Sequence, residues 1–135
     1  SRSNLVFYLP YTFPLLCGSQ FLKLSQMGIG IDIIEIERIK KALQNPRFAE
    51  RILRDKEKEH CKRVEQIAGR FCAKEAIMKA LGRRVPWKDI EILNDEDGKP
   101  RVNLYGRARE IAGEKKIQLS ISHSHTVAAA IALLF

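Results

Sequence analysis

Residues 28–34 read Gly-Ile-Gly-Ile-Asp-Ile-Ile, and this run sets the first element of the fold. β-Branched residues are enriched in strands, so the run predicts a β-strand. Side chains alternate between the two faces of a strand, which places three isoleucines on one face and two glycines with Asp32 on the other. Because a glycine has no side chain, the sequence predicts space beside Asp32 on its face of the strand.

The longest predicted helix covers residues 63–81, where good helix formers run throughout and Gly82 follows as the C-terminal cap. At about 100° per residue, Glu75 and Lys79 lie roughly 40° apart on the helical wheel. The rest of this helix is apolar on almost every side. Glu75 and Lys79 are therefore expected to form a narrow charged strip on a largely buried helix.

Shorter patterns predict the remaining elements. Helices are expected at 35–43, 46–53 and 105–115, and strands at 90–93, 101–104, 117–122 and 127–135, the last of them buried. The Asp97-Gly98 pair predicts a turn that joins the second strand to the third. Strands and helices do not alternate regularly, so the predicted class is α+β with an antiparallel sheet on a long central helix.

The composition fits one basic domain. A chain of 135 residues suits a single core, and its three cysteines lack any CxxC spacing, which indicates a reducing compartment. The net charge is +8, and residues 27–135 alone hold 22 basic and 16 acidic residues. Such a charge favours partners that carry phosphates or carboxylates, although a merely solvated basic surface gives the same composition.

Residues 1–26 are expected to lie outside the domain. The segment is apolar, but Pro10 and Pro14 interrupt it, so it is too short to span a bilayer and makes a poor secretory signal. Met27 is the predicted natural start. We therefore expect a leader or artificial extension at 1–26 and the functional domain at 27–135.

Asp32 is the first candidate site residue, because a carboxylate within an isoleucine-rich strand is costly to bury without compensation. A metal ion would compensate it, and so would backbone amides at the start of the following helix. Glu75 and Lys79 are the next candidates, with an ordinary surface ion pair as the alternative. Two acids and a lysine are what a magnesium–pyrophosphate site requires.

His123 and His125 lie in a segment rich in hydroxyl groups. Two histidines could ligate zinc, but no third soft ligand stands at a useful spacing. Such a turn could instead donate hydrogen bonds to a phosphate.

Four segments, 28–39, 69–82, 94–100 and 120–124, occur in the order and with the residues of a known family. Together they resemble the holo-acyl carrier protein synthases, the small bacterial members of the 4′-phosphopantetheinyl transferase superfamily. The strand with Asp32 followed by the block Arg-Phe-x-x-Lys-Glu-Ala-x-x-Lys-Ala is highly specific. The resemblance extends from Met27 to Phe135.

The resemblance implies an α+β fold in a homotrimer, with one active unit per subunit and active sites at the subunit interfaces. It implies transfer of 4′-phosphopantetheine from coenzyme A to a serine of an acidic apo-acyl carrier protein, with magnesium as cofactor and adenosine 3′,5′-bisphosphate as the second product. It also implies a cytoplasmic enzyme of fatty acid biosynthesis that acts on neither nucleic acid nor membrane.

The resemblance also implies roles for individual residues. The metal ligands are Asp32 and Glu75, the catalytic residues are Glu75 and Lys79, the coenzyme A contacts are Arg70, Lys79, His123 and Ser124, and the carrier-protein contacts are Arg38, Arg47 and Arg51. Lys74 is a weaker candidate for the coenzyme A site. Glu75 is the first choice to accept the serine proton, directly or through water.

Two departures from the family pattern stand out: the loop 82–86 is short, and Cys61 replaces a position that is often basic. Two other functions remain open from the residues alone. One is a small nucleic-acid-binding module, against which the few aromatic residues and the dispersed basic residues argue. The other is a related lipid- or sugar-modifying enzyme with the same metal site.

Overall fold

The computed structural model describes residues 27–135, so the predicted leader at 1–26 lies outside the described residues. In chain order the elements are β1 (Gly28–Glu35), α2 (Ile36–Ala42), α3 (Pro46–Ile52), α4 (Asp55–His60), α5 (Val64–Leu81), the 3₁₀ turn η1 (Trp87–Asp89), β2 (Ile90–Asn94), β3 (Pro100–Leu104), α6 (Gly106–Ala112), β4 (Ile117–His123) and β5 (Val127–Leu134).

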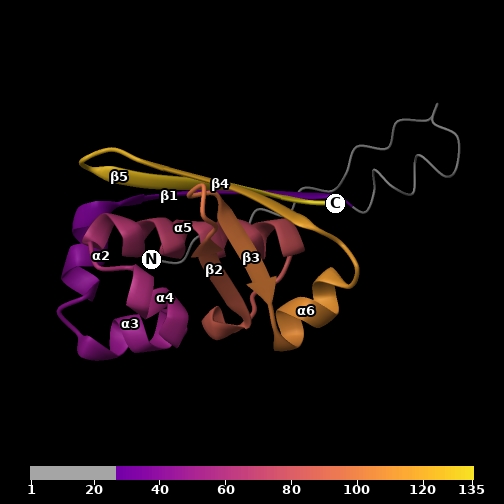
Figure 1. Cartoon of the computed structure of the whole chain (residues 1–135), viewed down its shortest axis with the longest axis horizontal. Helices are drawn as coiled ribbons and strands as arrows, with labels where there is room; N and C mark the ends of the chain where they lie inside the picture. The colour runs from indigo at the N-terminus through magenta and orange to yellow at the C-terminus, as the bar shows by residue number, and fades with distance from the viewer. Residues whose placement is uncertain (1–26) are drawn as a thin grey trace, which may run out of the picture.

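The strands form two antiparallel sheets, which confirms the predicted α+β class. One sheet has the order β1-β5-β4, and the other is the hairpin of β2 and β3. Figure 1 shows the three-stranded sheet along one side of the molecule, with α5 lying along its inner face. The small helices α2, α3 and α4 gather at one end of α5, and α6 lies toward the other.

Glycines let β1 lie directly against α5. A Cβ atom at Gly30 would stand 1.9 Å from the carbonyl oxygen of Ala76, and one at Gly28 would stand 2.0 Å from that of Ala80. The space predicted beside Asp32 is therefore taken by the helix backbone, which holds Asp32 against α5. Alanines of β5 face the same core, and Ala128 and Ala132 are fully buried.

Gly30→Ala is expected to lower the free energy of unfolding by about 3 kcal/mol, because the new methyl group must push α5 away from β1. Urea denaturation measures the change. Gly69→Ala is the matched control, since its Cβ would meet only a movable side-chain carbon of Ile121, at 3.1 Å. The gain in helix propensity offsets that contact, so the control should change stability by less than about 1 kcal/mol. Equal losses in the two variants would contradict the close packing of β1 on α5.

The opposite face of the three-stranded sheet is apolar and open to solvent. Ile29, Ile31 and Ile33 on β1 are each about two-thirds exposed, and Ile131 beside them on β5 is 42% exposed. No other part of residues 27–135 covers this face in Figure 1. The prediction that 127–135 forms a buried strand is therefore only half right, because every second residue of β5 points to this outer face.

Helix α4 was not predicted, because its sequence Asp-Lys-Glu-Lys-Glu-His has no apolar face. Its stability comes from one buried side chain. Glu57 accepts hydrogen bonds from Arg54 N at 2.8 Å, Ile92 N at 2.9 Å and Lys74 Nζ at 2.8 Å. A buried carboxylate is tolerated when it is paired and hydrogen-bonded in this way. The predicted helix 105–115 is also shorter than expected, since Gly113 ends it with a φ of 60°.

Candidate active site

Lys79 holds the Asp32 carboxylate. The ammonium of Lys79 on α5 donates to the carbonyl oxygen of Ile31 at 2.9 Å and to Asp32 Oδ1 at 3.3 Å. The Asp32 side chain is 10% exposed. The alternative in which Asp32 caps the next helix is not what the structure shows: α2 has no side-chain cap, and Ile36 N donates instead to the carbonyl oxygen of Thr126 at 2.8 Å.

Glu75 also lies in the interior and has an arginine partner. Its side chain is 6% exposed, and its Oε1 accepts a hydrogen bond from Arg84 Nη1 at 2.8 Å. The alternative of an ordinary surface pair between Glu75 and Lys79 is therefore wrong, because Glu75 is not a surface residue. Sequence reasoning missed Arg84, although its place just after the cap of α5 allows it to fold back along the helix.

The two carboxylates influence each other electrostatically. Burial raises the pKa of Asp32 above its ordinary value, Lys79 opposes that shift, and the negative charge of Glu75 raises the pKa further. An acid with a raised pKa holds negative charge that its surroundings do not fully compensate. Asp32 therefore senses the negative charge of Glu75, so the two carboxylates lie within electrostatic range of each other.

These residues fit a magnesium ion. Mg²⁺ prefers oxygen ligands and is commonly bound by one or two carboxylates, completed by water and substrate phosphates. Asp32 and Glu75 offer two such carboxylates, whose side chains are 10% and 6% exposed. Among residues 27–135 no three His, Cys, Asp or Glu side chains gather closely enough to hold a metal by themselves. Within that range, the zinc alternative at His123 and His125 therefore has no support.

Cys72 lies beside Asp32, and its thiol is not reactive. Burial, followed by the charge of Asp32, raises the pKa of Cys72 to about 12. Its Sγ lies 3.3 Å from the carbonyl oxygen of Ala128 in the core. Thiolates are the nucleophilic and metal-binding form of cysteine, so Cys72 serves packing.

The structure does not bring Arg70 or Lys74 to the acids. Arg70 Nε donates to the carbonyl oxygen of Ile92 at 3.1 Å, and its Nη2 donates to Asn94 Oδ1. Lys74 is fully buried, and its Nζ donates to Glu57 at 2.8 Å and to the carbonyl oxygen of Ile52 at 2.6 Å. Burial lowers the pKa of Lys74, and Glu57 opposes the shift. Lys74 thus joins α5 to α4, while Arg70 joins α5 to the β2–β3 hairpin.

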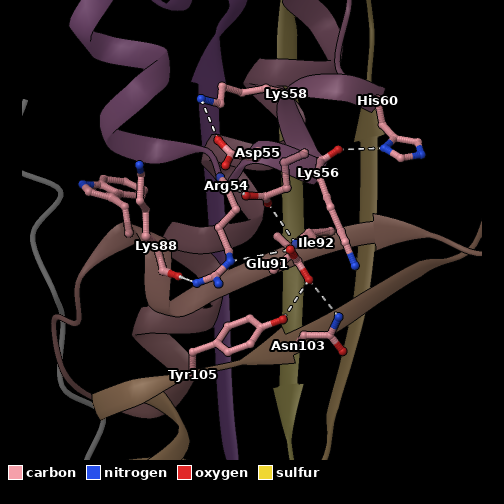
Figure 2. A network of polar contacts seen from close by, with 12 residues as sticks. Arg54, Asp55, Lys56, Lys58, His60, Lys88, Glu91, Ile92, Asn103 and Tyr105 are labelled. Carbon is pink, nitrogen blue, oxygen red and sulfur yellow. Dashed lines mark hydrogen bonds and ion pairs between the residues drawn. The ribbon is translucent and has the colours of Figure 1, made fainter.

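Another buried acid, Glu91, holds the β2–β3 hairpin in place, and no pattern in the sequence marks it. Figure 2 shows Tyr105 Oη and Asn103 Nδ2 donating to Glu91 at 3.1 and 3.0 Å. Arg54 Nε lies 3.6 Å from the same carboxylate, and Arg54 Nη1 donates to the carbonyl oxygen of Lys88 at 2.6 Å. The network ties α4 to β2, β3 and η1, and therefore supports the hairpin whose tip Arg70 contacts.

His123 and Ser124 are exposed where β4 turns into β5. Ser124 Oγ accepts hydrogen bonds from Thr126 N and Val127 N, each at 3.2 Å, which shapes the turn. Within residues 27–135, no hydrogen bond joins His123 or Ser124 to Asp32 or Glu75. Their predicted contact with coenzyme A remains a prediction.

The predicted partner residues share one end of the molecule. Arg38 on α2 and Arg47 and Arg51 on α3 are exposed. Figure 1 shows α2 and α3 at the end where β4 turns into β5, and the bond from Ile36 N to the carbonyl oxygen of Thr126 joins that turn to α2. The arrangement gathers three exposed basic side chains at one end of the molecule, and their contact with a carrier protein stays a prediction.

A groove of about 900 Å³ lies elsewhere, between β3, α6 and the start of β4. Its lining includes the basic residues Arg101, Arg109, Lys115 and Lys116, and neither Asp32 nor Glu75. The candidate site therefore rests on the chemistry of its residues and not on this groove.

An alignment model described as the 4′-phosphopantetheinyl transferase superfamily matches residues 28–132. This chain belongs to that superfamily. The match confirms the resemblance that the strand with Asp32 and the block around Glu75 predicted. The described elements begin and end within a few residues of the matched range.

The relatives of this chain described next are named for one activity. The holo-(acyl-carrier-protein) synthase of Alkaliphilus metalliredigens is 52% identical over 118 residues, covering 78% of this chain and 97% of that protein. The enzyme of the same name from Clostridium tetani is 47% identical over 119 residues, covering 80% and 94%. The chain is therefore an enzyme of the holo-(acyl-carrier-protein) synthase type, as the sequence predicted.

Solved structures agree with the fold. The Helicobacter pylori holo-(acyl-carrier-protein) synthase in complex with coenzyme A has a TM-score of 0.73 at 31% identity, covering 79% of this chain and 99% of that one. The Bacillus anthracis synthase, in complex with coenzyme A (3′,5′-ADP), has a TM-score of 0.69 at 43% identity, covering 79% and 94%.

In residues 27–135, no helix combines the length and apolar character that crossing a membrane requires.

Proposed function

We propose that this enzyme transfers 4′-phosphopantetheine from coenzyme A to a serine of apo-acyl carrier protein, with magnesium, in the cytoplasm and in support of fatty acid biosynthesis. The observation that carries the proposal is the pair of buried acids, Asp32 and Glu75, which interact electrostatically across β1 and α5 and have Lys79 beside them. The relatives named for this reaction, two of them solved with coenzyme A or its nucleotide, support the choice of substrate.

Magnesium would be held by Asp32 and Glu75, and when bound it would neutralise negative charge on the coenzyme A pyrophosphate. Lys79 lies 3.3 Å from Asp32 and can direct its ammonium toward the same phosphates. Glu75 is proposed to accept the proton of the serine hydroxyl while the serine oxygen attacks the β-phosphorus of coenzyme A. Adenosine 3′,5′-bisphosphate then leaves. Glu75 is buried and the Asp32 side chain is 10% exposed, so both acids are held in place before the substrate arrives, which lowers the reorganisation that the reaction needs.

We further propose that the enzyme is a homotrimer with active sites at its subunit interfaces. The outer face of the three-stranded sheet supports this, because Ile29, Ile31, Ile33 and Ile131 leave an apolar surface that water covers at a cost. An interfacial site also accounts for Arg70, His123 and Ser124. Within residues 27–135 none of the three is hydrogen-bonded to Asp32 or Glu75, and each is proposed to contact coenzyme A bound at an interface.

The exposed arginines of α2 and α3 are proposed to receive the acidic carrier protein. Arg38→Glu should raise the KM for the carrier roughly 5- to 20-fold with little change in kcat, because it reverses the local field that attracts the carrier. The difference should shrink as salt is added. Steady-state kinetics at two salt concentrations measure it. Lys116→Glu makes the same charge change beyond the far end of α6, and an equal rise in KM there would contradict a local docking surface.

Mass spectrometry of the acceptor tests the proposed reaction. Purified enzyme is incubated with apo-acyl carrier protein, coenzyme A and Mg²⁺, and the carrier should gain the mass of one phosphopantetheine arm. A carrier whose serine is replaced by alanine should gain nothing. An unmodified wild-type carrier, under conditions where another holo-(acyl-carrier-protein) synthase completes the reaction, would end the proposal.

A further inference from the structure

Lys74 is a fully buried lysine that makes three hydrogen bonds within residues 27–135. From α5 its Nζ donates to the carbonyl oxygen of Ile52 at 2.6 Å, to Glu57 Oε2 at 2.8 Å and to the carbonyl oxygen of Trp87 at 3.3 Å. An ammonium group has three hydrogens, so each of them has an acceptor. Lys74 therefore connects α5 to the last residue of α3, to α4 and to η1 at one point.

Glu57 holds the ammonium group of Lys74 in place. This carboxylate is also fully buried, and two backbone donors fix it: Oε1 accepts from Ile92 N at 2.9 Å, and Oε2 accepts from Arg54 N at 2.8 Å. A buried ion pair whose polar groups are all satisfied fixes a geometry firmly, because displacing either charge would leave the other unpaired in the interior.

Helix α3 contacts α5 near both of its ends. Near its start, the ring of Phe48 lies 6.2 Å from the ring of Phe71 on α5, and at its end the carbonyl oxygen of Ile52 accepts the bond from Lys74. Residues four apart lie on one face of a helix, so Phe48 and Ile52 both face α5. Loss of the lysine bond would leave the ring contact in place and free the last turn of α3, which carries Arg51, to shift.

We infer that Lys74 is a positioning residue for the carrier protein: its bond to Ile52 holds the last turn of α3, and with it Arg51, at a fixed distance from the acids of the site. Lys74 and Glu75 are consecutive residues of one helix, so the anchor of α3 and the acid proposed to act on the serine move together. This role needs no contact of Lys74 with substrate or metal. The inference rests on the proposed function, because it takes α3 as part of the docking surface, and it adds what sets the distance from that surface to the reacting serine.

Steady-state kinetics of Lys74→Met test the inference. Met keeps the length of the side chain but cannot donate to Ile52, so the KM for the carrier protein should rise roughly 3- to 10-fold. The KM for coenzyme A should stay within about 2-fold of wild type, because Lys74 and Glu75 point about 100° apart on α5. Partial unfolding lowers the amount of active enzyme, and therefore the apparent kcat, without changing KM. A purely structural role would leave the carrier KM at its wild-type value.

A double-substitution cycle shows whether the effect passes through α3. Arg51→Glu should raise the carrier KM by a smaller factor in Lys74→Met than in wild type, because the arginine no longer has a fixed place. Arg38→Glu on α2, to which Lys74 donates no hydrogen bond, should raise it by the same factor in both backgrounds. Equal factors for Arg51→Glu in the two backgrounds, or smaller factors for both arginines, would contradict a role through α3.

Lys58→Met is the matched control. Lys58 also links α4 to α3, since its Nζ lies 2.7 Å from Glu50 Oε1, but the Glu50 side chain is 63% exposed. An exposed ion pair contributes little, so the carrier KM should change by less than about 2-fold. A rise as large as that of Lys74→Met would show that the buried bond has no special role.

A second variant guards against loss of the fold, because Lys74→Met leaves Glu57 as an unpaired buried charge. Lys74→Met combined with Glu57→Gln removes both charges, still lacks the bond to Ile52 and should give the same rise in carrier KM; circular dichroism shows which variants fold. A wild-type carrier KM, or a double variant that does not fold, would overturn the inference. If Arg38→Glu and Arg51→Glu left the KM of the otherwise wild-type enzyme unchanged, the docking surface of the proposed function would fall instead, which separates the two failures.

Discussion

Asp32→Asn is expected to lower the rate of phosphopantetheine transfer by on the order of 1,000-fold or more, because it removes one of two carboxylates proposed to hold the metal. Asn keeps the size of the side chain, so the contact of β1 with α5 should survive. The mass-spectrometric transfer assay, run at saturating coenzyme A and Mg²⁺, measures the loss. Asp55→Asn removes a carboxylate from exposed α4 and should transfer at the wild-type rate.

The same substitution should stabilise the metal-free protein. The pKa of Asp32 is raised in the folded state, chiefly by burial. A raised pKa means that the group favours folding at pH values below its unfolded pKa and that this contribution is lost as the pH rises through the folded pKa. At pH 7 the ionised Asp32 therefore costs stability, and an uncharged Asn should raise Tm by about 1–5 °C.

Differential scanning calorimetry in a chelating buffer measures the change. An Asp32→Asn protein that melts lower than wild type would show that Lys79 compensates the carboxylate more than burial penalises it. An Asp32→Asn protein with the wild-type rate of transfer and the wild-type melting temperature would show that Asp32 is not part of the site.

Ile31→Lys should convert the proposed trimer to monomer and lower transfer by about 100-fold or more, because it places a charge at the centre of the apolar sheet face. Ile31 pairs with Ile131 across β1 and β5, and both side chains point outward. A desolvated lysine without a partner costs several kcal/mol in each subunit of an interface. The monomer itself should fold, since Ile31 is 65% exposed there.

Sedimentation velocity measures whether the variant is a trimer or a monomer, and circular dichroism measures whether the monomer is folded. Ile31→Val keeps the face apolar and should remain a trimer with full transfer. A wild-type enzyme that sediments as a monomer and is fully active would contradict both the trimer and the interfacial site. An Ile31→Lys protein that stays trimeric would place the interface on another surface.

The elements with strong local signals were predictable. The β-branched run around Asp32 became β1, the helix-forming run before Gly82 became α5, and the Asp97-Gly98 turn joins β2 to β3. Each signal is local, either a periodicity or a backbone preference, so it can be read without the rest of the chain. The apolar character of α5 indicated a largely buried helix, whereas the spacing of Glu75 and Lys79 left an ordinary surface pair open, and only the fold shows that Glu75 is buried.

Other features depend on contacts between distant parts of the chain. Helix α4 has no apolar periodicity, and it forms around Glu57, whose partner Lys74 is 17 residues away. The motif that contains Lys74 suggested a ligand contact, whereas the fold uses that lysine in a buried ion pair. The contact of Arg84 with Glu75 was not predictable either, because the sequence of a short loop does not show which acid a long arginine side chain will reach.

Asp32 and Glu75 are proposed to bind one divalent cation together, and anomalous diffraction can locate that ion. Crystals of the enzyme grown with Mn²⁺ and coenzyme A would locate the metal without reference to any assay. We expect one anomalous peak per active site, within coordination distance of a carboxylate oxygen from Asp32 and of one from Glu75. A peak bound to other side chains, or two acids that point to separate surfaces, would contradict it.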